Sequence, residues 1–154
     1  MELEELLKTL RDYPGLVRKS CIGSWARVNA EQCGSLVCGP GDDAGAVEFE
    51  GKHFLLSAEG LLPDLFEDPV FAGFCAVTVS VNDIYAMGGR PGGIALVVAA
   101  GDFTEGERSG FLKGLQRGLA HYRLPLLGGH TSPEGGAKFV AVAVVGTARR
   151  LMRG

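Results

Sequence analysis

Two apolar runs constrain the fold of this chain more than any other feature of its sequence. They are "IALVVAA" (residues 94–100) and "FVAVAVV" (residues 139–145), and both are apolar at every position. An unbroken apolar run rich in valine and isoleucine is typical of a strand that is covered on both faces of its sheet. Each run has seven residues, far fewer than the roughly 18 that a membrane span requires. We therefore expect a sheet buried on both faces and no crossing of a membrane.

The rest of the sequence predicts helices and further strands around these two runs. Residues 68–87 give conflicting signals, because "CAVTVSV" is strand-like, whereas Asp68 followed by Pro69 starts a helix and Gly88 with Gly89 ends one. We interpret this segment as a long buried helix. The predicted helices are 2–12, 68–87 and 104–122, the last opened by a Thr104–Glu107 capping box, and the predicted strands are 44–48, 53–58, 91–101, 124–127 and 138–147.

This order of elements predicts an α+β fold in which two helices cover one face of a single sheet. Two helices leave the other face of the apolar strands without cover, and a second copy related by two-fold symmetry is the most economical cover. Hydrophobic residues make up 46% of the chain and charged residues 21%, which is ordinary for a globular domain. We expect one domain over residues 1–154, in which residues 1–35 form a helical or irregular extension.

Charge and cysteine content exclude several classes of function. The formal net charge is −3, so there is no basic surplus to neutralise a nucleic-acid backbone. The four cysteines, Cys21, Cys33, Cys38 and Cys75, form no C-x-x-C pair and no cluster with histidine at metal-binding spacing. Reduced thiols and a cytoplasmic location are therefore expected, and a reactive Cys33 or Cys38 is the alternative to an inert thiol.

Acidic residues beside glycines are the candidate binding features. Asp42 and Asp43 are adjacent in a glycine-proline turn, Glu59 ends a predicted strand, Asp83 lies near the end of the long helix, and His130 lies in a second predicted glycine turn, after Gly128 and Gly129. Carboxylates that converge on one point need a cation, and Mg²⁺ takes carboxylate and phosphate oxygens together. The alternatives are a simple turn for the two aspartates, a helix-end residue for Asp83 and a solvated loop for His130. Neither G-x-G-x-x-G nor the Walker pattern is present.

The order of three segments resembles a known family. "GDDAGAV", "VSVNDIYAMGGRPGGIALVV" and "LPLLGGHT" follow one another between residues 39 and 147 as in the amino-terminal domain of the PurM-like superfamily. This superfamily includes aminoimidazole ribonucleotide synthetase, selenophosphate synthetase, thiamine-monophosphate kinase and the hydrogenase maturation factor HypE. The segment "SAEGLLPDLFEDP" is similar to its AIR synthase-related branch.

The resemblance implies an ATP-dependent domain that holds phosphate through Mg²⁺. It implies a mixed four-stranded sheet with two covering helices, and a homodimer whose two sheets close a β-barrel. The implied metal ligands are Asp42, Asp43, Glu59 and Asp83, and the implied nucleotide-binding residues are Gly41, Asn82, Gly128, Gly129, His130 and Thr131.

Three departures from the family pattern leave two function classes open. The chain stops where relatives continue into a second domain, Glu59 stands where relatives carry aspartate, and no G-C-G-C-K-like segment of the selenophosphate enzymes is present. One class is the Mg-ATP half of a phosphotransferase or synthetase, completed by a separate C-terminal-domain partner and acting on a small molecule. The other is a non-catalytic dimeric module that binds nucleotide or regulates. Neither class involves nucleic acid or a membrane.

Overall fold

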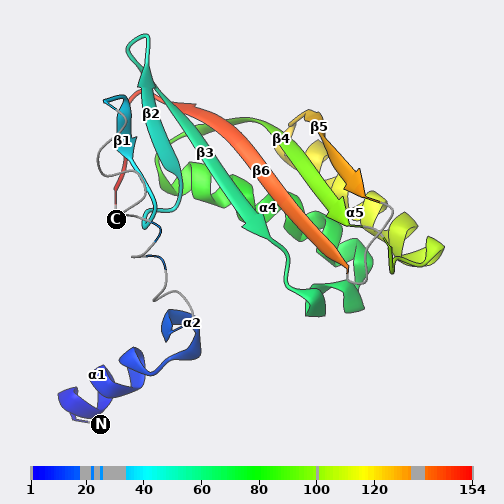
Figure 1. The fold of residues 1–154 in the computed structure, drawn as a ribbon, viewed down its shortest axis with the longest axis horizontal. Helices are drawn as coiled ribbons and strands as arrows, with labels where there is room; N and C mark the ends of the chain where they lie inside the picture. Colours follow the sequence, from blue (N-terminus) through cyan, green and yellow to red (C-terminus); the bar gives the residue numbers. More distant parts are fainter. Residues whose placement is uncertain are drawn as a thin grey trace.

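A mixed sheet of six strands organises the chain in the computed structural model (Figure 1). The structure describes residues 2–17, 22, 25, 34–99, 101–132 and 138–153. The strand order is β1-β2-β3-β6-β4-β5. The elements are α1 (Leu3–Arg11), α2 (Pro14–Val17), β1 (Leu36–Cys38), β2 (Gly45–Phe49), β3 (Lys52–Gly60), the 3-10 helix η2 (Pro63–Glu67), α4 (Pro69–Ala86), β4 (Arg90–Ala99), α5 (Glu105–Tyr122), β5 (Leu126–Ser132) and β6 (Phe139–Ala148).

The α+β class is confirmed, but the prediction of a four-stranded sheet was wrong. The strands predicted over residues 44–48 and 53–58 are present as β2 and β3, which form a hairpin closed by Glu50 and Gly51 with φ of 51° and 73°. Positive φ at both central residues matches the twist of the flanking strands. The sheet is larger than predicted because β1 pairs with β2 and so extends the sheet beyond the hairpin. At the other edge, β5 pairs in parallel with β4 and continues through the glycines that we expected to form a turn.

The long helix α4 resolves the conflict between strand-like composition and helix caps. The Asp68 side chain accepts a hydrogen bond from the Phe71 backbone N–H at 3.0 Å, and Gly88 follows the helix with a φ of 72°. Among the described helices, only α4 is long and apolar enough to cross a membrane by length and composition. Seven of its residues are buried in the protein core, as in a core helix.

The two long helices lie against each other at glycines. A Cβ atom at Gly114 of α5 would lie 1.9 Å from the Val70 carbonyl oxygen, and one at Gly73 of α4 would lie 2.1 Å from the Phe111 oxygen. Backbone of one helix therefore touches backbone of the other, which no larger residue permits. This contact fixes the close spacing of α4 and α5, the two helices that cover the sheet.

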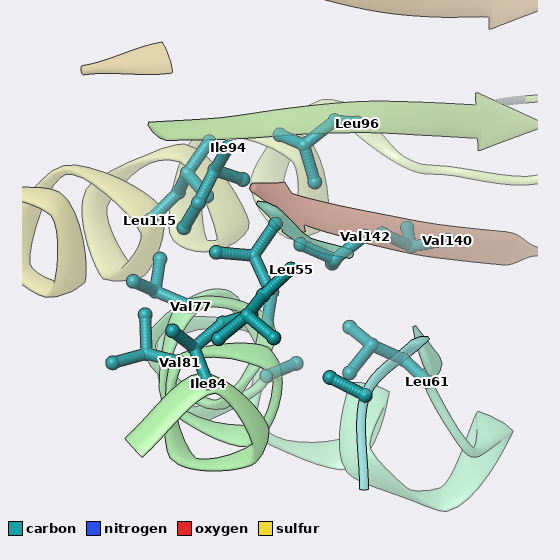
Figure 2. Packing of buried hydrophobic residues seen from close by; sticks show 14 of the residues in the cluster. Leu55, Leu61, Val77, Val81, Ile84, Ile94, Leu96, Leu115, Val140 and Val142 are labelled. Atoms are coloured by element: carbon teal, nitrogen blue, oxygen red, sulfur yellow. The ribbon is translucent and has the colours of Figure 1, made fainter. Parts of the chain in front are cut away.

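The core fills the space between α4, α5 and one face of the sheet (Figure 2). Ile94, Val140, Val142 and Val144 of the central strands are all at most 1% exposed. The opposite side of the same strands is an outer face with large apolar side chains that are 39–55% exposed: Val47, Phe54, Leu56, Val97, Phe139 and Val145. The strand register places these six on one side, since Val47 pairs with Phe54 and Leu56 with Val145. The burial expected for both faces is therefore present on only one face within the single chain.

The amino-terminal helix α1 forms as predicted from its leucine spacing. None of its residues is buried, and Leu3, Leu6, Leu7 and Leu10 are 36–68% exposed. In Figure 1, α1 and α2 lie apart from the sheet.

Candidate functional site

The two adjacent aspartates lie in the turn between β1 and β2. Asp42 is half-buried and Asp43 is exposed. Asp42 Oδ1 accepts the Asp43 backbone N–H at 3.2 Å, and Asp42 Oδ2 accepts the Cys38 thiol at 2.9 Å. Gly41, just before them, has a φ of 119°, which favours glycine. The hydrogen bond from the Asp43 N–H to Asp42 Oδ1 is typical of an aspartate in a turn. The other carboxylate oxygen of Asp42, Oδ2, is held by Cys38 of β1.

Cys38 was not expected to contact this turn. The pKa of its thiol is raised to about 11. Burial is the largest cause, and the hydrogen bond to Asp42 and the negative charge of Asp42 add to it. The thiol is therefore protonated near neutral pH and serves as a donor, which disfavours a reactive Cys38. The other candidate thiol, Cys33, lies outside the described residues.

A pocket of about 410 Å³ brings the acidic turn together with the end of β3. Asp42, Asp43 and Glu59 all line it, with Ser57 and Cys38 beside them. Ser57 and Glu59 share one face of β3 because side chains alternate along a strand. Three of the four predicted metal ligands therefore lie around one cavity, which we call the acidic pocket.

Asp83 is connected to the acidic pocket through Ser57. The Ser57 hydroxyl, which is only 5% exposed, donates a hydrogen bond to Asp83 Oδ2 on α4. Ser57 was not predicted as a site residue, although it lies two residues before Glu59 in the predicted strand and so shares a face with it. The neighbouring Asn82 is exposed and does not line the acidic pocket.

The second predicted group lies elsewhere on the sheet. Glu59 pairs with Val142, Val142 with Leu96, and Leu96 with Gly129, so Glu59 and Gly129 lie in one row three strand spacings apart, about 14 Å. Gly128, Gly129, His130 and Thr131 belong to the edge strand β5 and not to a loop. The structure therefore separates the β5 residues from Glu59 by two intervening strands within one chain.

No preformed ion cage is present in the part of the chain that the structure describes. No three His, Cys, Asp or Glu side chains there are grouped closely enough to hold a metal ion. Mg²⁺ commonly binds to one or two carboxylates and completes its shell with water and substrate phosphates. The oxygen-rich acidic pocket fits that mode of binding.

Comparison with known proteins supports the resemblance found in the sequence. An uncharacterized protein of Synechocystis is 42% identical over 113 residues, which are 73% of this chain and 34% of that protein. Thiamine-monophosphate kinase of Pyrococcus abyssi is 36% identical over 98 residues, 60% of this chain and 31% of the kinase. The structure of ThiL from Aquifex aeolicus complexed with AMPPCP and TMP shares the fold, with a TM-score of 0.66 and 22% identity over 99% of this chain and 46% of that one. The chain thus spans less than half the length of each of these proteins.

A family model also matches the segment that contains every predicted site residue. It covers residues 41–148 and is described as AIR synthase related protein, N-terminal domain. The match begins at Gly41 of the acidic turn and ends at the last residue of β6. Because it covers more than half of the chain and agrees with the PurM-like resemblance, this chain belongs to the AIR synthase related protein family through the family's N-terminal domain.

Proposed function

We propose that this chain is the Mg-ATP-binding domain of an ATP-dependent phosphotransferase or synthetase. Asp42, Asp43, Glu59 and Asp83 hold Mg²⁺ together with the phosphates of ATP. The observation that carries the proposal is the acidic pocket, where three carboxylates surround one cavity and Ser57 connects it to Asp83. The family membership and the relatives named as kinases favour this function over a non-catalytic module.

The chemistry of such a domain is electrostatic. Mg²⁺ held by the carboxylates of the acidic pocket would neutralise charge on the phosphates of ATP, and the residues of this chain would position the nucleotide. Glu59 is one methylene longer than aspartate, so its carboxylate reaches further into the acidic pocket than an aspartate would. We propose a small molecule as the substrate of this domain, and the sequence leaves the phosphoryl acceptor open.

Gly41, Asn82, Gly128, Gly129, His130 and Thr131 are proposed to contact the nucleotide. The 14 Å row between Glu59 and Gly129 means that the β5 residues contact a different part of the nucleotide from the metal, or act from a second copy. We propose a cytoplasmic homodimer that works with a C-terminal-domain partner.

Isothermal calorimetry tests the metal-bridged site. Wild type should bind ATP measurably with Mg²⁺ and much more weakly without it. Asp43→Asn should weaken Mg-ATP binding about tenfold or more, because it removes a ligand charge without touching the core. Glu48→Gln is the matched control, since it removes an exposed carboxylate from β2 outside the acidic pocket and should leave the affinity unchanged.

Equal ATP affinity with and without Mg²⁺, in wild type and in Asp43→Asn, would contradict the proposal and favour the turn interpretation. If wild type binds no ATP alone, the titration is repeated with the second domain of a full-length relative supplied as a separate chain. Failure to bind in that mixture would also contradict the proposal.

A further inference from the structure

The amphipathic helix α1 carries an apolar face that the described part of the chain does not cover. Leu3, Leu6, Leu7 and Leu10 follow the spacing of one helix face and are 36–68% exposed, and we call them the leucine stripe. No residue of α1 is buried, and in Figure 1 the helix lies apart from the sheet. A helix of nine residues is only marginally stable alone in water, so a partner that covers the leucine stripe would stabilise it.

The leucine stripe is symmetric about its midpoint. Leu3 and Leu10 lie equally far from the point between Leu6 and Leu7, so the stripe has the same spacing in either chain direction. Two copies of α1 that run antiparallel can therefore overlap fully. Leu3 then lies opposite the partner's Leu10, and Leu6 lies opposite the partner's Leu7. Such a contact uses the same surface on both copies, as two-fold symmetry requires.

The charged residues beside the leucine stripe favour the antiparallel orientation. Glu4 lies three positions before Leu7 and Arg11 four positions after it, so both border the same flank of the stripe. Glu4 is in the first turn and Arg11 in the last turn, so antiparallel copies bring Glu4 beside the partner's Arg11, twice by symmetry. Parallel copies would instead bring Glu4 beside the partner's Glu2, which borders the other flank. Like charges in that position oppose parallel pairing.

We propose that α1 pairs antiparallel with α1 of a second copy of this chain, through the leucine stripe and two ion pairs between Glu4 and Arg11. Two helices of nine residues bury much less than the roughly 1,200 Å² of a stable interface. The pairing therefore strengthens a contact that is also made elsewhere, and it rests on the proposed homodimer, in which the outer faces of the two sheets would meet. Nucleotide and Mg²⁺ have no part in it.

Disulfide trapping between two variants of the full chain tests the orientation. Leu3→Cys and Leu10→Cys chains are mixed and mildly oxidised, and mass spectrometry of peptides separates the new disulfides from any that the native cysteines form. An antiparallel pair should give mainly the disulfide that joins position 3 of one copy to position 10 of the other. Two copies of position 3 would lie about 10 Å apart along the helices, too far for a disulfide. Disulfides 3–3 and 10–10 in equal or greater yield, or no disulfide at these positions, would overturn the proposal.

Charge reversal tests the ion pairs by sedimentation equilibrium. Glu4→Arg and Arg11→Glu each place like charges side by side, so each should weaken self-association about three- to tenfold. The double variant restores opposite charges and should associate more tightly than either single variant. Within one helix the double variant is the least favourable, because both new charges oppose the helix dipole. Recovery of association therefore has to come from the contact between copies.

Asp12→Arg is the matched control for Glu4→Arg. It makes the same change of net charge at the C-terminal cap, on the side of the helix away from the leucine stripe, and should leave self-association unchanged. Equal weakening by Asp12→Arg and Glu4→Arg, or a double variant weaker than both single variants, would overturn the proposal. A dimeric wild type without the 3–10 disulfide would overturn this contact alone, whereas a monomeric wild type would contradict the homodimer as well.

Discussion

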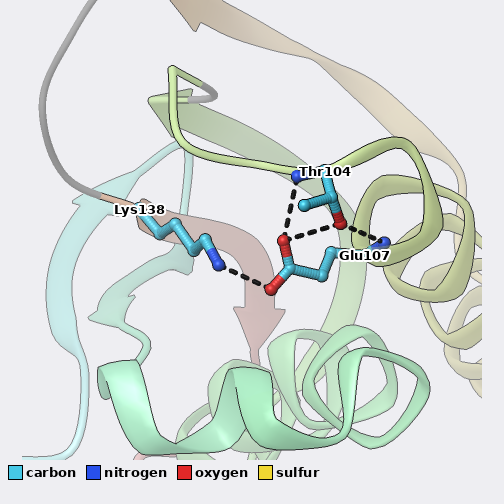
Figure 3. A network of polar contacts seen from close by, with 3 residues as sticks. All are labelled: Thr104, Glu107 and Lys138. Carbon is cyan, nitrogen blue, oxygen red and sulfur yellow. Dashed lines mark hydrogen bonds and ion pairs between the residues drawn. The ribbon is translucent and has the colours of Figure 1, made fainter.

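The Glu107 carboxylate, which is half-buried, accepts hydrogen bonds from several partners at once. It accepts hydrogen bonds from Lys138 Nζ at 2.5 Å and from the Thr104 backbone N–H and hydroxyl, each at 2.9 Å (Figure 3). The bond from Lys138 is the main reason that the pKa of Glu107 falls from 4.5 to about 2, and the two bonds from Thr104 add to it. These bonds join the start of α5 to the residue that precedes β6.

We predict a pH-dependent loss of stability in Glu107→Gln. A carboxyl whose pKa is lower in the folded state stabilises the fold above its unfolded value near 4.5, and this contribution is lost as the pH falls toward about 2. The variant should therefore be less stable than wild type at pH 7, and the difference should shrink between pH 4.5 and 2. Urea unfolding at several pH values measures it. Glu105→Gln, in the same first turn but outside the network, should show a much smaller difference, and an equal pH dependence in both variants would contradict the prediction.

Some residues of the candidate site were predicted from the sequence, and others were not. Asp42, Asp43 and Glu59 were predicted together and lie around one pocket, because a hairpin is a local structure that brings its ends close. The Ser57–Asp83 hydrogen bond joins β3 to α4 across 26 positions in sequence, and no local pattern predicts such a contact. His130 was expected in a loop near the acids and lies instead in an edge strand.

At the scale of elements, the helix-capping residues predicted the type of secondary structure better than amino-acid composition did. Asp68 with Pro69, and Thr104 with Glu107, correctly predicted the starts of α4 and α5, since caps act within a few residues. The strand β5 was predicted too short because its two glycines were interpreted as a turn. Gly129 sits in the strand against the Leu96 carbonyl, a long-range contact that local propensity does not contain. The three-residue strand β1 was not predicted, because it is defined by its pairing with β2.

The contact between α4 and α5 gives a test at this scale. Gly114→Ala would place a methyl group 1.9 Å from the Val70 oxygen, so the helices must separate, and the free energy of unfolding should fall by about 1–3 kcal/mol or more. Gly106→Ala in the same helix is the matched control, because no atom lies within 4 Å of the new methyl. It should leave stability unchanged or raise it by up to about 1 kcal/mol. Equal effects of the two substitutions in urea unfolding would show that the helix contact is looser than the structure has it.

At the scale of the whole molecule, the outer face of the sheet exposes large apolar side chains that the single chain does not cover. The apolar strands were predicted to be covered on both faces, and one chain covers only the face that packs on α4 and α5. The exposed apolar residues extend across β2, β3, β6 and β4, which makes a contiguous patch rather than scattered side chains. Contiguous apolar patches of this kind mark interaction surfaces. A two-fold pair of sheets would cover each face with the same face of a second copy, which is why the sequence predicted a homodimer.

We predict that the protein is a homodimer at micromolar concentration, sealed by the sheet segments 93–99 and 139–145. Val97 is 45% exposed in the single chain and lies opposite Ala141, at the middle of the outer face. Val97→Asp should dissociate the dimer, because a carboxylate without a partner is costly to bury between two apolar sheets. Sedimentation velocity measures the mass, and circular dichroism checks that the monomer remains folded. Val79→Asp, on α4 and 37% exposed, adds the same charge away from the outer face and should remain dimeric. A monomeric wild type, or a soluble folded dimer of Val97→Asp, would show that this face is not the interface.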